Sequence, residues 1–134
     1  CRPWPQLRGF LHYSKGKPYN NRILYVSKRL QIFQWLHVPP NAILINDVCF
    51  INWGAQVEFL CIYDPDNARS LKISLLDCQR ITYDLLEPDY AERESIADVI
   101  GFHWHDQDAN KHVVIHTDLW EMNVICKDLA YEFR

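Results

Sequence analysis

Four of the six histidines in this 134-residue chain lie in one stretch, GFHWHDQDANKHVVIHTD at residues 101–118, together with three aspartates. Neutral imidazole is a good ligand for zinc, iron, nickel and copper, and a carboxylate often completes such a site. The stretch therefore has three interpretations: a transition-metal site, a catalytic centre, or a solvent-facing hairpin that is rich in histidine.

Two strands joined by a short loop must position these histidines. Successive residues of a strand point to opposite faces, so His103 and His105 share a face. If residues 107–110 form the loop, His105 lies opposite His112 and His103 lies opposite Val114. A change of one residue in the loop turns one strand over relative to the other, so the register decides whether a site forms.

The metal hypothesis follows from this register. His103, His105 and His116 then lie along one face, with Asp118 as the fourth ligand or as a base, around a divalent transition metal. The alternative requires no ligand, because the same pattern describes a hairpin whose polar face meets water. In that case apolar side chains point inward: Phe102, Trp104, Val113 and Ile115.

Other arrangements that could carry catalysis are scarce. The chain has only four glycines and no GxSxG motif or glycine-rich phosphate loop. A thiol–imidazole pair between Cys126 and a hairpin histidine is conceivable, but a buried strand cysteine is usually unreactive. No catalytic residue is assigned, and the sequence favours a non-enzymatic protein without a cofactor.

The elements that hold the hairpin are predicted to be mainly strands. Ser27 can cap a helix over residues 28–37 that Pro39 ends, with a start near Asn21 as the alternative. Asp89 can cap a short helix over residues 90–98. Short alternating runs predict the strands, at residues 22–26, 41–52, 56–64, 71–77, 80–86, 100–106, 111–118 and 120–133. The expected fold class is α+β, mainly antiparallel β, as a sandwich or partly closed barrel with one or two short helices.

Charge divides this single domain, residues 1–134, into two parts. Residues 1–46 hold seven basic and no acidic residues, whereas residues 47–134 hold seven basic and seventeen acidic ones. We interpret residues 1–21 as a basic, aromatic arm and residues 42–134 as a β-rich core. The residues of the arm that we expect to bind a partner are Arg8, Tyr13, Lys15, Lys17 and Tyr19.

The five cysteines bear on the compartment. None is spaced as CxxC, and all but Cys1 lie in apolar stretches, which predicts buried free thiols and a cytoplasmic protein. The alternative is a lipoprotein that begins at a lipidated Cys1. No apolar run approaches the ~18–20 residues of a membrane span.

Three functions follow, in order of preference. The first is a small adaptor or inhibitor-like protein that binds another protein, or a second copy of itself through the basic arm. The second is a metal-dependent enzyme with its site on the histidine hairpin. The third is a nucleic-acid binder that uses the basic and aromatic arm.

Overall fold

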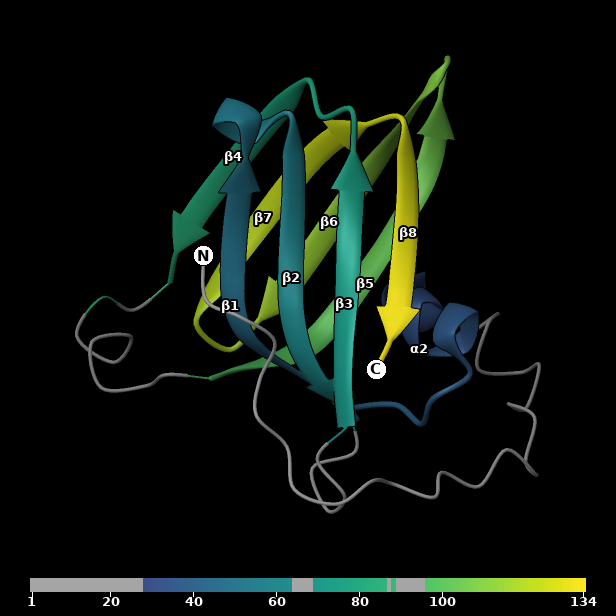
Figure 1. Ribbon diagram of the computed structural model, residues 1–134, viewed down its shortest axis with the longest axis vertical. Coiled ribbons are helices and arrows are strands. Elements are labelled where there is room, and N and C mark those ends of the chain that lie inside the picture. Colours follow the sequence, from purple (N-terminus) through teal and green to yellow (C-terminus); the bar gives the residue numbers. More distant parts are fainter. Residues whose placement is uncertain (1–27, 64–68, 87, 89–95) are drawn as a thin grey trace.

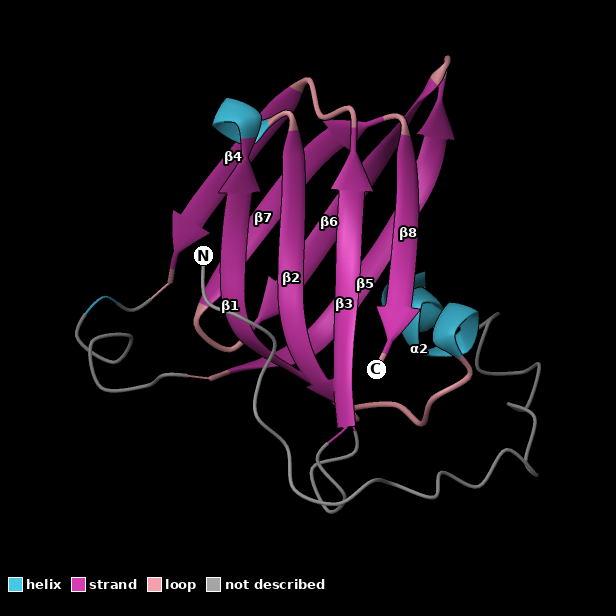
Figure 2. Ribbon diagram, in the orientation of Figure 1, coloured by secondary structure: helices cyan, strands magenta, loops and turns pink. Residues whose placement is uncertain are grey.

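The structure is a computed structural model, and it describes residues 28–63, 69–86, 88 and 96–134. Eight antiparallel strands form one sheet in the order β4-β7-β6-β5-β1-β2-β3-β8, and the sheet does not close into a barrel (Figures 1 and 2). The strands are β1 (Ile43–Ile51), β2 (Gln56–Tyr63), β3 (Arg69–Leu76), β4 (Arg80–Leu85), β5 (Ala97–Gln107), β6 (Asn110–Thr117), β7 (Trp120–Cys126) and β8 (Asp128–Phe133). The predicted fold class is confirmed.

The sheet bends over on itself, so that two halves face each other. In Figure 1, β1, β2, β3 and β8 form the front half, and β4, β5, β6 and β7 cross behind them. The halves are joined where β1 pairs with β5, at Leu44 with Asp98 and at Ile45 with Ala97. The apolar core lies between the halves and is built from the alternate residues that each strand turns inward.

Aromatic rings link the two halves across this core. Phe59 of β2 is fully buried. Its ring lies 6.1 Å from Phe102 of β5, centroid to centroid, and 6.3 Å from Trp120 of β7. The predicted inward face of β2 is confirmed, because Val57, Phe59 and Cys61 are all buried in the core. Leu60, on the opposite face, is buried as well, so β2 is more than half buried.

A short helical segment covers one end of β5. It starts as the 3-10 helix η1 (Lys28–Leu30) and continues as α2 (Gln31–Leu36). The helix ends at His37, whose left-handed φ of 58° lets its N–H bond back to Gln34 O. At the start of α2 the N-cap residue is Leu30, whose side chain makes no capping hydrogen bond. The predicted cap, Ser27, and the predicted strand at residues 22–26 lie outside the described residues.

The prediction of a helix over residues 90–98 is wrong at its C-terminal end. Residues 90–95 lie outside the part that the structure describes. Ala97 and Asp98 belong to β5, because they pair with β1 and form the junction of the two halves. Pairing between segments distant in sequence outweighs the local capping signal here.

The prediction of free thiols holds for three cysteines and is wrong for Cys49. Cys61, Cys78 and Cys126 are free, whereas Cys49 is disulfide-bonded. The register of β1 shifts between Ile45 and Asp47, and Cys49 then lies opposite Glu58, whose strand neighbours Val57 and Phe59 face the core. The bulge therefore turns Cys49 to the face of the sheet away from the core.

No helix in the described part of the chain is long and apolar enough to cross a membrane.

Candidate functional site

The histidine hairpin folds in the register that sets His105 opposite His112, which the sequence alone left open. β5 and β6 are joined by a two-residue turn at Asp108 and Ala109, so the loop is shorter than expected, but His105 lies opposite His112. His103 lies opposite Val114. The four imidazoles therefore project from one face of the sheet, the face away from the core.

The imidazoles meet in two pairs. The rings of His103 and His116 stack at 6.0 Å, and those of His105 and His112 meet edge to face at 5.0 Å. Neighbouring side chains on β7 already occupy two ring nitrogens: His116 Nδ1 lies 3.2 Å from Glu121 Oε1, and His112 Nε2 lies 3.2 Å from Asn123 Oδ1.

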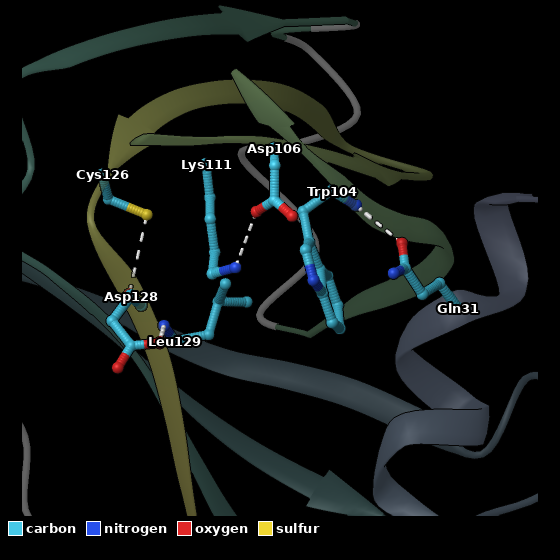
Figure 3. Close-up of polar contacts among 7 residues, drawn as sticks. All are labelled: Gln31, Trp104, Asp106, Lys111, Cys126, Asp128 and Leu129. Atoms are coloured by element: carbon cyan, nitrogen blue, oxygen red, sulfur yellow. Dashed lines mark hydrogen bonds and ion pairs between the residues drawn. The ribbon is translucent and has the colours of Figure 1, made fainter. Parts of the chain in front are cut away.

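The aspartates of the stretch have other partners. Asp118 Oδ1 accepts a hydrogen bond from the backbone N–H of Asp98 at 2.8 Å. Asp106 forms an ion pair with Lys111 Nζ at 2.8 Å (Figure 3). Of the four predicted ligands, His103 and His116 come together, while His105 pairs with His112 and Asp118 bonds to the main chain.

No group of three or more His, Cys, Asp or Glu side chains within the described ranges is arranged to hold a metal ion. The metal site at His103, His105, His116 and Asp118 remains a prediction.

The helical segment closes one end of this face. A Cβ at Gly101 would lie 2.8 Å from Arg29 Cβ, so only glycine lets η1 approach β5 this closely. Gln31 Oε1 accepts a hydrogen bond from the backbone N–H of Trp104 at 2.8 Å (Figure 3). The pairing of β5 with β1 does not extend to Trp104, so the helix supplies a partner for this backbone donor.

Burial and crowding of positive charge lower the pKa of His103. The largest cause is desolvation, followed by the imidazoles of His116, His105 and His112 and by the ammonium of Lys28. Burial and these positively charged neighbours all disfavour the protonated form of His103, so the imidazole is neutral at physiological pH.

We expect a pH dependence of stability from this histidine. Its pKa in the unfolded chain is near the ordinary 6.5 and is lower in the fold, so the unfolded state binds more protons as the solution is acidified. The contribution of His103 to the stability of the fold is therefore complete above the pKa that His103 has in the unfolded chain. This contribution is lost as the pH falls through the lower pKa that His103 has in the fold. Urea unfolding of the wild type and His103→Gln at a series of pH values measures it, and the variant should show the shallower dependence.

The control for that prediction is His37→Asn, because asparagine also adopts the left-handed backbone of His37. This variant should keep the pH dependence of the wild type. Equal slopes for the wild type and His103→Gln would contradict the assignment to His103.

A thiol nucleophile is not supported at Cys126. Burial raises the pKa of its thiol to about 11. Its Sγ donates to Asp128 O at 3.6 Å (Figure 3). A thiol with this pKa is almost entirely protonated at neutral pH, when it is a poor nucleophile.

A second candidate surface, which sequence reasoning missed, lies at the turn between β1 and β2. Trp53 is fully exposed at 105% relative accessibility, and Phe50 is 51% exposed. The turn forms the 3-10 helix η2 (Asn52–Gly54), in which the φ of Trp53 is 63°. A bulky side chain rarely adopts this backbone region, which costs roughly 1 kcal/mol. The sequence NWGA contains the signal, a tryptophan inside a turn.

The turn is anchored against the beginning of β4. Ala55 O accepts a hydrogen bond from Cys78 N at 2.8 Å, and a Cβ at Gly54 would lie 3.3 Å from Ile81 Cδ1. Trp53 is thus presented to solvent from a held turn. Phe50 lies opposite the buried Val57 and so projects to the core side of β1, where it remains half exposed.

The arm residues predicted to bind a partner lie outside the described residues, namely Arg8, Tyr13, Lys15, Lys17 and Tyr19.

Comparison with known proteins shows the fold alone. No protein-family model matches the chain, and no curated protein matches it. A solved structure of an uncharacterized protein from Neisseria gonorrhoeae is similar in fold, with a TM-score of 0.50 and 10% sequence identity. The match covers 71% of this chain and 93% of that one.

Proposed function

We propose that this protein is a non-enzymatic adaptor or inhibitor that binds a protein partner through Trp53 and Phe50 at the β1–β2 turn. The observation that carries the proposal is Trp53, a fully exposed tryptophan at a left-handed backbone position of an anchored turn. A strained, exposed side chain of this size opposes folding in isolation, and such strain concentrates at sites of binding and catalysis.

The side chains on this surface are of the kinds that dominate protein interfaces. Tryptophan is enriched among the residues whose truncation costs most affinity, and aromatic residues are enriched in the buried centre of interfaces. A rigid turn also lowers the entropy lost on binding, because the backbone is already ordered in the free protein.

The net charge of residues 47–134 supports a basic partner. Residues 47–134 carry seven basic and seventeen acidic side chains, a net of 7 − 17 = −10. The backbone N–H of Cys78 anchors the turn by its hydrogen bond to Ala55 O. The residue before Cys78 is the exposed Asp77, which brings a carboxylate close to the turn. We therefore propose a partner segment with apolar side chains next to lysine or arginine.

Selection from a random-peptide display library tests the proposal while the natural partner is still unidentified. The wild type should enrich peptides that combine aromatic or aliphatic residues with basic ones. These peptides should lose binding to Trp53→Gly and retain it to His105→Ala, which alters the histidine face. Selected peptides that bind Trp53→Gly as tightly as the wild type would refute the site, and failure to enrich any sequence would count against the function.

A further inference from the structure

Strand β4 is one of the two edges of the sheet. Among the described residues it pairs with β7 alone, and five of its six residues are exposed. Tyr83 lies opposite the buried Met122 and so projects to the core side of the sheet, yet it is 47% exposed. An edge of this length with apolar side chains exposed beside it is a template for pairing with another strand.

The backbone groups of β4 divide between its two sides. Leu86 N donates to Leu119 O at 3.0 Å, so residue 86 points its main-chain groups to the β7 side. Because these groups alternate along an antiparallel strand, residues 80, 82 and 84 also point toward β7. The N–H and C=O groups of Ile81, Tyr83 and Leu85 therefore point to the open side.

The opposite charges of Arg80 and Asp84 favour pairing of β4 with the β4 strand of a second copy. Arg80 and Asp84 lie two residues on either side of Thr82, on the same face of the strand. If two β4 strands pair antiparallel about a two-fold axis at Thr82, Arg80 of each copy lies opposite Asp84 of the other. The same register pairs Ile81 with Tyr83 of the second copy through the outward backbone groups, so the charge pairing and the hydrogen-bond pattern agree.

We propose that this protein forms a symmetric dimer through β4, with the two-fold axis at Thr82. The contact is isologous, so each favourable cross-strand pair occurs twice. It places Ile81 of one copy against Tyr83 of the other and covers part of the exposed aromatic ring. This surface adjoins the Trp53 surface at Ile81, which lies against Gly54, but it uses the backbone edge and the charges of β4 rather than the turn.

The opposite edge of the sheet does not offer the same complementarity. Strand β8 has two acidic residues, Asp128 and Glu132, and no basic residue. Within the bounds of β8, no antiparallel register of two such strands gives an attractive charge pair, because the nearest basic residues, Lys127 and Arg134, lie just beyond its two ends. The ring of Tyr131 on β8 also packs against Trp35 of α2, at 4.6 Å between centroids.

Charge reversal on the full chain tests the dimer, with mass measured by sedimentation equilibrium over the widest accessible concentration range. The wild type should approach twice the chain mass of 16.0 kDa. Arg80→Asp and Asp84→Arg should each raise the dissociation constant roughly 30-fold, because two attractive pairs become repulsive. The double variant Arg80→Asp/Asp84→Arg should restore the wild-type constant, which a variant that merely misfolds would not do.

Two control variants separate this contact from others. Lys127→Asp makes the same change of charge on an exposed turn and should leave the constant unchanged. Lys15→Glu/Lys17→Glu reverses charge in the basic arm and should also leave it unchanged. A wild type that stays at 16.0 kDa, or a dimer that the arm variant disrupts and Arg80→Asp does not, would overturn the proposal.

Discussion

Replacing Phe59 by alanine is expected to lower the free energy of unfolding by about 3–5 kcal/mol, which is a large part of the stability of a single domain. Phe59 is fully buried and contacts Phe102 and Trp120, which belong to the opposite half of the folded sheet. Its removal leaves a cavity between the two halves. Strand pairing joins β1 to β5 at only two residue pairs, so packing must hold the halves together.

Urea unfolding measures this effect, and the thermal midpoint should fall by about 10–20 °C. Phe50→Ala is the matched control, because it removes the same side chain from the adjacent strand at a position that is 51% exposed. It should cost less than about 1 kcal/mol. A loss below about 1 kcal/mol for Phe59→Ala would contradict a core shared by the two halves.

Replacing Trp53 by glycine should change stability and binding in opposite directions. Glycine adopts the φ of 63° without a steric penalty, so the free energy of unfolding should rise, by up to about 1 kcal/mol. Affinity for a peptide selected on the wild type should fall by at least about 2 kcal/mol, or roughly 30-fold. The gain in stability excludes misfolding as the cause of the lost affinity.

Chemical denaturation and isothermal titration measure the two quantities. Trp53→Asn is the companion variant, since asparagine tolerates the left-handed region and lacks the aromatic ring. It should bind as weakly as Trp53→Gly. A Trp53→Gly variant that is destabilised by more than about 1 kcal/mol would mean that the ring contributes to the fold rather than to a partner.

Local patterns in the sequence predicted most of the elements. The alternation of Val57, Phe59 and Cys61 identified β2, because the period of a strand depends on residues close in sequence. The register that sets His105 opposite His112 was left open, because a change of one residue in the loop turns one strand over.

Features that depend on distant residues could not be predicted in this way. The bulge at Asp47 turns Cys49 away from the core, and nothing in the alternation of β1 reveals it. Ala97 joins β5 because β1 lies beside it, although the local sequence resembles the end of a helix. The order of strands that leaves β4 at an edge follows from the packing of the whole chain.

In the candidate sites, too, local features could be predicted from the sequence and contacts between distant residues could not. The period of a strand placed His103 with His105 and His112 with His116, but the register that brings all four to one face was open. The partners of Asp118 and His116 depend on β5 and β7. The sequence shows only that Trp53 lies between two predicted strands, because its exposure and its backbone conformation are properties of the fold.

Trp53 is expected to contact the partner, and fluorine NMR of protein labelled with 5-fluorotryptophan tests this contact most directly. The chain has five tryptophans, and Trp53→Gly identifies the resonance of Trp53 by its absence. On addition of the selected peptide, the Trp53 resonance should shift while those of Trp35, Trp104 and Trp120 remain in place. A Trp53 resonance that stays unchanged at saturating peptide would contradict the account.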